Sequence, residues 1–68
     1  MNISFGTNLK ALREKKKMSQ EDLARKLQIS RQSISKWEQS ISYPSVLYLV
    51  PLTKILDCTL EELLKDLN

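Results

Sequence analysis

The chain has 68 residues, of which 41% are hydrophobic and 28% are charged, and its formal net charge is +3. A single domain of this length buries only about 60% of the surface that its unfolded chain exposes. One cysteine and no histidine exclude an internal disulfide framework and a multi-cysteine zinc site. No long apolar run is present at the start, so we expect no signal peptide, no membrane span and a cytoplasmic location.

The charge is distributed unevenly along the chain. Residues 1–40 contain nine Lys/Arg and four Asp/Glu, a balance of +5, whereas residues 41–68 contain two and four, a balance of −2. A basic first half indicates a surface that could face a polyanion. An ordinary solvated surface would also be compatible with this pattern, so charge alone does not decide between the two interpretations.

The first two predicted helices are recognised by apolar residues at helical spacing. Phe5, Leu9 and Leu12 recur at i, i+4 and i+7 within residues 4–17, which we predict to be the first helix. A second, shorter amphipathic helix is predicted over residues 20–27.

Serine residues precede the second and third helices. Ser19 is a natural N-cap, and Asp22, three residues later, is an acidic near-match to a capping box. Ser30 caps a third predicted helix over residues 31–39. Two capped helices this close together require a sharp turn of the chain, which is helix-turn-helix geometry.

A fourth helix is predicted to follow Ser45 as its N-cap and to end at Leu56. Pro51 lies inside it, where a proline removes one hydrogen bond and clashes with a preceding carbonyl at a cost of ~3 kcal/mol. We therefore expect a kink or a break there. Thr59 and Glu62 form a full capping box for a fifth helix. Its apolar residues are Leu60, Leu63, Leu64 and Leu67.

The third predicted helix is unusually polar. Only Ile34 and Trp37 are apolar anchors, so a wheel at ~100° per residue places most of its circumference outside the core. The residues on the outward side are Gln32, Ser35, Lys36 and Gln39, with Arg31 on the flank. A polar helix face of this kind fits the major groove of DNA. The alternative interpretation is a helix that is merely solvated.

A set of residues at characteristic spacing extends over most of the chain. It comprises Arg13, Ser19-Gln20, Leu23-Ala24, Ile29-Ser30, Ile34-Ser35, Trp37-Glu38 and Pro44-Ser45. With this set, the sequence resembles the phage repressor/Cro-type (Xre-type) helix-turn-helix family over roughly residues 5–67. The resemblance implies an all-α, compact five-helix repressor-like domain. It would occupy residues 1–68, with the helix-turn-helix at about residues 19–39.

The chemistry of the third helix and the resemblance agree on candidate base-reading residues. Arg31 can pair with O6 and N7 of guanine, and Gln32 with N6 and N7 of adenine. Lys36 can reach guanine or a phosphate, and Ser35 is the fourth candidate. In proteins similar to this one, the positions that match Arg31, Gln32 and Lys36 read bases.

The resemblance also implies contacts to the DNA backbone. Gln20 begins the second helix, and the N-terminus of a helix offers free N–H groups to a phosphate. Ser30, Ser33 and Gln39 are the other candidates for backbone contacts. The alternative for Gln20 is that it only occupies the first helical position.

Arg13 and Glu38 are the candidate structural ion pair. On the wheel, Glu38 lies at the edge of the core, about 70° from the inward direction. Similar domains pair the two matching positions in a salt bridge. The expected role is to hold the third helix to the first, and not catalysis.

Three features depart from the family pattern. Gln28 and Ser40 stand where related sequences often have glycine, so a left-handed backbone there would cost roughly 1 kcal/mol more. Ile41, Ser42 and Tyr43 stand where basic loop residues are common. Contacts between this loop and the DNA backbone are therefore not expected to be strong. Pro51 is the third departure.

The leading hypothesis is a sequence-specific DNA-binding transcriptional regulator, a repressor, that inserts residues 31–39 into the major groove. We expect a homodimer on a palindromic operator, with half-sites about 34 Å apart. The dimer contact is expected on the fourth and fifth helices, at Tyr48, Leu64 or Leu67. Double-stranded DNA is then the partner. We expect no metal, no cofactor, no small-molecule ligand and no membrane.

Other functional classes are also considered. An antitoxin or another protein-interaction module would use the same fold, although no long disordered tail is visible. RNA binding is disfavoured because the stacking aromatics of RNA modules are missing. An enzyme would need catalytic groups, but the chain has no histidine and no glycine-rich loop. We therefore expect no enzymatic activity.

Overall fold

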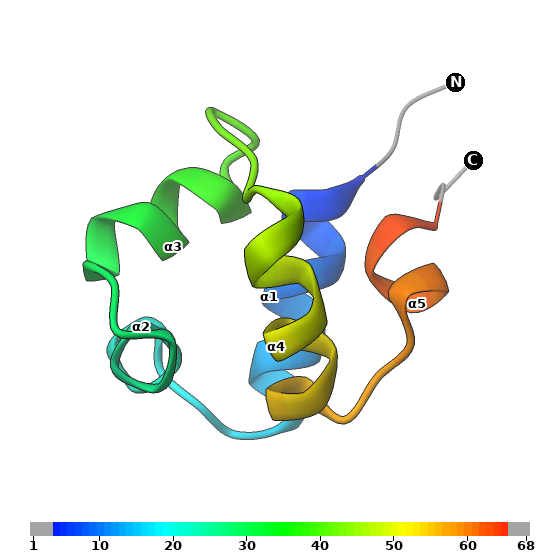
Figure 1. Ribbon diagram of the computed structural model, residues 1–68, viewed down its shortest axis with the longest axis horizontal. Helices are drawn as coiled ribbons and strands as arrows, with labels where there is room; N and C mark the ends of the chain where they lie inside the picture. Colours follow the sequence, from blue (N-terminus) through cyan, green and yellow to red (C-terminus); the bar gives the residue numbers. More distant parts are fainter. Residues whose placement is uncertain (1–3, 66–68) are drawn as a thin grey trace.

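The computed structural model describes residues 4–65, which form five α-helices and no strand (Figure 1). The helices are α1 (Phe5–Lys15), α2 (Gln20–Leu27), α3 (Arg31–Glu38), α4 (Val46–Leu56) and α5 (Leu60–Leu64). The predicted all-α fold is confirmed, with α2 and α3 as the helix-turn-helix. None of these helices has both the length and the apolar character needed to cross a membrane.

Side-chain caps define where three of the helices begin. Ser19 Oγ accepts the backbone N–H of Asp22 at 2.9 Å, and the Asp22 carboxylate accepts that of Ser19 at 2.9 Å. Thr59 and Glu62 form the same reciprocal box at α5. These bonds from the cap backbone lower the pKa of both carboxyl groups below the ordinary values. Ser30 caps α3 as predicted.

α4 has the predicted bounds, but it is not broken at Pro51. The helix continues from Val46 to Leu56 through Pro51, so the expectation of a break is wrong. Pro51 withholds only the hydrogen bond that would reach the carbonyl of Leu47, and Leu47 lies in the exposed first turn. Ser45 has the extended backbone of an N-cap, but its side chain makes no capping hydrogen bond.

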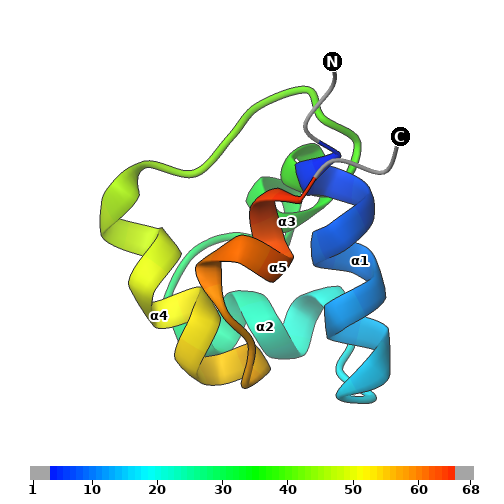
Figure 2. The same ribbon diagram turned by 90° about the vertical axis from the view of Figure 1, so that its right-hand side faces the viewer.

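Each helix contributes to one buried core. α3 packs against α1 and α2, and α5 packs against α1 and α4 (Figure 2). The buried hydrophobic residues are Phe5, Leu9, Leu23, Ala24, Ile34, Trp37, Leu52, Leu56 and Leu63.

A buried amide fixes α5 to α1. Asn8 lies on α1 and is only 3% exposed. Its Nδ2 donates to the backbone carbonyls of Leu63 and Lys65, both at 2.9 Å. These carbonyls lie at the C-terminal end of α5, where helix carbonyls lack partners within the helix. Asn8 therefore closes the end of a very short helix, a role that helical periodicity did not predict.

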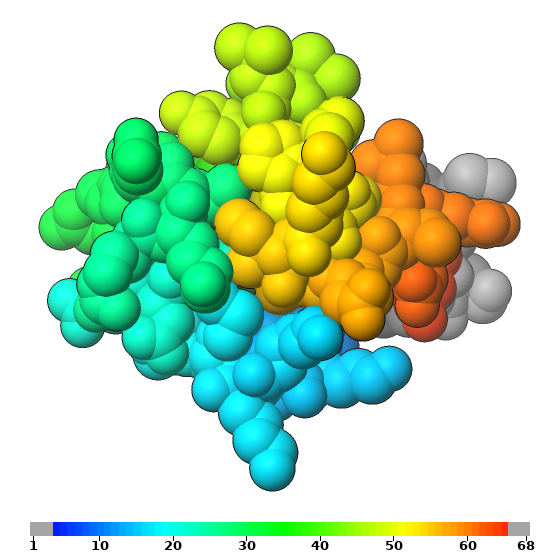
Figure 3. All heavy atoms as spheres, turned by 60° about the horizontal axis from the view of Figure 1, so that its bottom comes forward, coloured from blue at the N-terminus to red at the C-terminus, as the bar shows by residue number. Residues whose placement is uncertain are grey.

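The most exposed large hydrophobic side chains lie on α4, on the loop before it and at the start of α5. They are Ile41, Tyr43, Val46, Leu47, Val50 and Leu60. Figure 3 shows α4 and α5 side by side on one face. Tyr48 and Leu64, which were named as candidates for a dimer contact, are half-buried and pack against the core. The ring of Tyr48 lies 5.7 Å from that of Trp37. Leu67 lies outside the described residues.

Four helices are followed by a non-glycine residue with a left-handed backbone. Gln28 (φ 60°) and Ser40 (φ 61°) adopt it after α2 and α3. Lys17 (φ 58°) and Asp57 (φ 53°) adopt it after α1 and α4. The left-handed region is unfavourable for a residue with a Cβ. Each of these residues therefore makes the fold slightly less stable than glycine at the same position would.

Replacing Gln28 or Ser40 by glycine is expected to raise the free energy of unfolding by about 0.5–1 kcal/mol each. The substitution removes the unfavourable Cβ contact of a left-handed residue, which outweighs the greater entropy of glycine in the unfolded chain. Urea denaturation of each variant measures the change. Lys26→Gly is the control, because Lys26 is exposed within α2 and glycine there should lower stability by about 1 kcal/mol. A loss in all three variants would contradict the strain argument.

Candidate nucleic-acid interface

α3 buries two hydrophobic side chains in the core and exposes three long polar ones. Ile34 is 0% exposed and Trp37 is 6% exposed. On the other side of the helix, Arg31, Gln32 and Lys36 are exposed. Three of the four candidate base-reading residues are therefore not packed inward, and no neighbouring helix buries these three within residues 4–65.

The smaller polar residues of α3 bond to one another. Gln39 follows the last residue of α3, and its Nε2 donates to Ser35 Oγ at 2.8 Å. Ser30 Oγ accepts the backbone N–H of Ser33 at 3.2 Å, and the two hydroxyl oxygens lie 3.0 Å apart. Ser35 and Ser33 are half-buried, whereas Ser30 and Gln39 are exposed.

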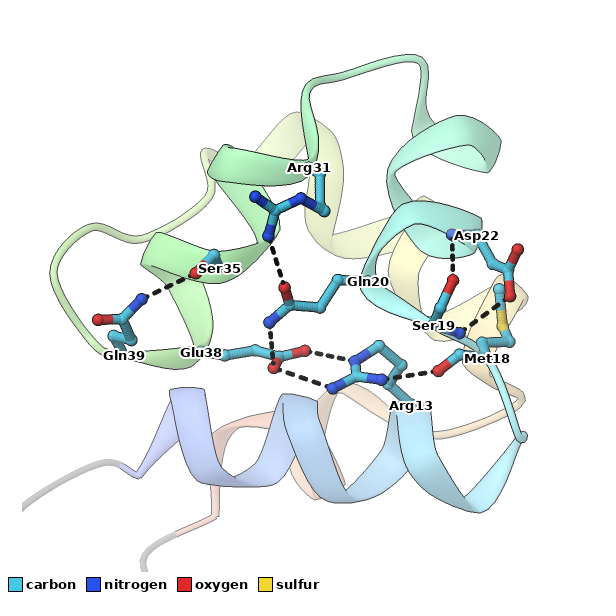
Figure 4. A network of polar contacts seen from close by, with 9 residues as sticks. All are labelled: Arg13, Met18, Ser19, Gln20, Asp22, Arg31, Ser35, Glu38 and Gln39. Atoms are coloured by element: carbon cyan, nitrogen blue, oxygen red, sulfur yellow. Dashed lines mark hydrogen bonds and ion pairs between the residues drawn. The ribbon is translucent and has the colours of Figure 1, made fainter.

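Arg13 and Glu38 form a buried ion pair between α1 and α3 (Figure 4). Arg13 Nε donates to Glu38 Oε2 at 2.6 Å, and Nη2 donates to Oε1 at 3.2 Å. The third nitrogen, Nη1, donates to the backbone carbonyl of Met18 at 2.7 Å. The side chains are 10% and 4% exposed. Hydrogen bonding to Glu38 raises the pKa of Arg13 above its ordinary value, so the guanidinium stays charged.

Gln20 connects this ion pair to the exposed side of α3 (Figure 4). Its Nε2 donates to Glu38 Oε1 at 3.0 Å, and its Oε1 accepts from Arg31 Nη1 at 3.2 Å. A carboxylate only accepts hydrogen bonds, so the amide nitrogen must face Glu38 and the amide oxygen is left for Arg31. The first residue of α2 thus holds the guanidinium at the start of α3.

This connection was missed from the sequence. The pattern identified Gln20 only as a candidate for the DNA backbone, but the structure engages its side chain in two protein contacts. Nε2 has a second N–H that no hydrogen bond within residues 4–65 uses. No signal in the sequence identifies the bond to Glu38, because Gln20 and Glu38 are 18 residues apart.

The loop between α3 and α4 contains no basic residue. Ile41 and Tyr43 are 64% and 60% exposed. The ring of Tyr43 lies 6.1 Å from that of Phe5 at a tilt of 59°. The positive charge of the helix-turn-helix comes from Arg31 and Lys36 on α3 and from Arg25 and Lys26 on α2.

Comparison with known proteins places this arrangement in a family. Residues 9–63 match the helix-turn-helix family model HTH_3. The transcriptional activator BcrR of Enterococcus faecalis is 40% identical over 62 residues, which is 91% of this chain and 30% of that protein. The chain spans about a third to a half of the length of the curated relatives that it matches.

Solved structures of similar size also match. The P22 c2 repressor, crystallised with a synthetic operator, is 34% identical with a TM-score of 0.85, covering 96% of this chain and 97% of that one. The restriction-modification controller protein C.AhdI of Aeromonas hydrophila is 31% identical with a TM-score of 0.80, covering 90% and 92%. The chain therefore belongs to the Cro/C1-type (Xre-type) helix-turn-helix family.

Proposed function

We propose that this chain is a sequence-specific DNA-binding transcriptional regulator, a repressor, which inserts α3 into the major groove. The observation that carries the proposal is the exposed polar side of α3, held in place by two buried anchors. The major groove admits one α-helix and presents base edges as hydrogen-bond donors and acceptors. The P22 c2 repressor, which is similar over nearly the whole chain, was crystallised with an operator.

Base reading is assigned to Arg31, Gln32, Ser35 and Lys36. Arg31 can donate two hydrogen bonds to guanine, and Gln32 can donate to and accept from adenine. Lys36 reaches guanine or a phosphate. The Ser35 hydroxyl accepts from Gln39 and keeps its own O–H as a donor.

Contacts to the DNA backbone are assigned to residues that border this surface. The free N–H of Gln20 Nε2 can reach a phosphate while the amide keeps its bonds to Glu38 and Arg31. Ser30, Ser33 and Gln39 complete the assignment. Such contacts fix the position of the protein on the duplex and carry no sequence information.

We further propose that the functional unit is a homodimer on a palindromic operator, with contact through α4 and α5. A two-fold dimer would place two copies of α3 about 34 Å apart, in successive major grooves. The exposed hydrophobic residues of α4 and α5 support this arrangement.

The function is tested by selecting duplexes from a random pool and titrating the chain against a selected duplex and a scrambled one at several salt concentrations. Tighter binding of the selected duplex is expected, with a slope of log K against log salt of about −0.9 per phosphate contact. A palindrome among the selected sequences would support the two-fold arrangement. Equal affinity for both duplexes would reject sequence reading, and a slope near zero would reject phosphate contact.

Arg31→Ala is expected to lose about 1–3 kcal/mol of discrimination at one base pair of the selected site. The physical reason is the loss of a two-bond contact to guanine. Competition titrations with single-base variants of the site measure the change. Lys15→Ala is the matched control, since it removes the same charge from an exposed position on α1. If both variants bind all single-base variants with the same uniform loss, Arg31 contributes only charge.

A further inference from the structure

Two hydrogen bonds join Ser35 to Gln39 at the C-terminal end of α3. The backbone N–H of Gln39 donates to the carbonyl oxygen of Ser35 at 3.0 Å, and the amide Nε2 of Gln39 donates to Ser35 Oγ at 2.8 Å. Figure 4 shows this amide reaching toward the Ser35 hydroxyl. Ser35 is half-buried. The amide of Gln39 is therefore fixed against a hydroxyl that is partly shielded from solvent.

The direction of the side-chain bond determines what the Ser35 hydroxyl can offer to DNA. A hydroxyl has one O–H donor and two lone pairs, and the amide nitrogen of Gln39 can only donate, so it uses a lone pair. Helical serines often donate to the carbonyl one turn earlier, but within residues 4–65 the Ser35 O–H donates to no protein group. A base donor would leave this O–H unpaired, which is unfavourable once water is excluded. Ser35 is therefore prepared to donate to a base and not to accept from one.

Donation and acceptance select different bases at the same place in the major groove. The exocyclic O6 of guanine and O4 of thymine are acceptors, whereas the exocyclic N6 of adenine and N4 of cytosine are donors. A hydroxyl that donates therefore favours guanine over adenine, or thymine over cytosine. A hydroxyl that accepts has the reverse preference. The side chain that sets the direction of the Ser35 hydrogen bond thus sets the preferred base.

We propose that Gln39 is a specificity-determining positioning residue, which keeps Ser35 a hydrogen-bond donor and so selects guanine O6 or thymine O4 at one base pair. The inference rests on the proposed function and deepens it. Ser35 follows Arg31 by one helical turn, about 6 Å along α3, and base pairs are spaced by about 3.4 Å. The selected base pair is therefore one or two steps from the one that Arg31 reads. The second N–H of Gln39 Nε2 remains available to a phosphate.

Gln39→Glu is the decisive variant, because it reverses the direction of the bond. A carboxylate only accepts, so the Ser35 O–H turns toward it and leaves lone pairs for the base. At one base pair the preference should move from guanine toward adenine, or from thymine toward cytosine. The ratio of the two affinities should change by at least about fivefold. Competition titrations with all single-base variants of the selected duplex measure this ratio at every position.

Three further variants separate this effect from charge. Gln28→Glu is the matched control, because Gln28 is exposed after α2 and undergoes the same change from amide to carboxylate. It should weaken binding to all duplexes alike and leave the base preferences unchanged. Gln39→Ala frees the hydroxyl for either role, so the affinity ratio should approach one. The double variant Ser35→Ala/Gln39→Glu should have the same preference at this base pair as Ser35→Ala. Circular dichroism verifies that each variant keeps its helices.

The contact between the two side chains is tested without DNA. Nuclear magnetic resonance measures the pKa of the introduced carboxyl group in Gln39→Glu and in Ser35→Ala/Gln39→Glu. A hydrogen bond from the Ser35 hydroxyl stabilises the charged form of this group. Its pKa should therefore be lower by roughly half a unit in the variant that keeps Ser35. Equal pKa values in the two variants would overturn the proposal, because the hydroxyl would then not respond to residue 39.

The base preferences separate this proposal from the proposed function. If the wild-type chain selects a sequence and Gln39→Glu has the same preference at every base pair, the role of Gln39 is overturned and sequence reading stands. The same result is expected if the amide oxygen of Gln39 faces Ser35, because the wild-type chain would then already resemble Gln39→Glu. If the wild-type chain prefers no duplex, the proposed function fails and the role of Gln39 fails with it.

Discussion

Replacing Glu38 by alanine is expected to lower the free energy of unfolding by about 3–5 kcal/mol. The substitution would leave the Arg13 guanidinium buried without its charge partner, and the side chain of Arg13 is only 10% exposed. Two of the three hydrogen bonds that satisfy this guanidinium end on Glu38, and the third ends on the carbonyl of Met18. Small domains have a total stability of about 5–15 kcal/mol. The loss is therefore a large fraction of the whole.

Urea denaturation of Glu38→Ala measures this loss. Glu61→Ala is the control, because Glu61 is exposed and its removal should change stability by less than about 1 kcal/mol. The double variant Arg13→Met/Glu38→Leu should recover most of the loss, since replacing both partners by apolar residues leaves no buried charge. If Glu38→Ala is no less stable than Glu61→Ala, the pair contributes little to the fold.

The same carboxylate connects stability to the proposed DNA surface. Glu38 Oε1 accepts from Gln20, and Gln20 accepts from Arg31. Without Glu38 the amide of Gln20 has no fixed orientation, and Arg31 loses a defined partner. The residue that holds α3 to α1 therefore also orders the start of α3.

The positions of the helices could be predicted from the sequence because the signals are local. Ser19 and Thr59 each cap a helix together with a carboxylate three residues later. The two residues of each capping box are therefore close together in the sequence. The two anchors of α3, Ile34 and Trp37, could also be predicted, because one helical wheel determines the buried side. The left-handed backbone of Gln28 is likewise a property of the end of a single helix.

Contacts between helices could not be predicted in this way. The bond from Asn8 to the carbonyl of Leu63 joins residues that are 55 positions apart. The burial of Tyr48 depends on Trp37, which lies on a different helix. Pro51 was expected to kink or break α4, and the helix is not broken, because the missing hydrogen bond falls in an exposed turn. Each of these features depends on how the helices pack, which the amphipathic pattern of a single helix does not specify.

The only glycine of the chain illustrates the same limit. Gly6 lies in the first turn of α1 and is buried. A Cβ at this position would lie 2.8 Å from the carbonyl oxygen of Trp37 and would collide with the carbonyl oxygen of Glu38. α1 and α3 therefore approach backbone to backbone at this point. The ion pair of Glu38 with Arg13 lies between the same two helices.

Gly6→Ala is expected to lower the free energy of unfolding by up to about 3 kcal/mol. Glycine is the poorer helix former by about 1 kcal/mol, so without the contact the substitution would stabilise α1. The atoms that the new methyl group meets belong to the backbone of α3 and cannot rotate away. α1 must instead move away from α3, which would lengthen the hydrogen bonds between Arg13 and Glu38.

Thermal and urea denaturation of Gly6→Ala measure the effect, with Thr7→Ala as the control. Thr7 is the next residue in α1 and is exposed, so alanine there should be neutral or slightly stabilising. Gly6→Val should be worse than Gly6→Ala, since its two additional methyl groups enter the same contact. A stability of Gly6→Ala equal to or above that of Thr7→Ala would show that α1 and α3 can separate without loss. The close approach of their backbones would then not be what holds α3 in position.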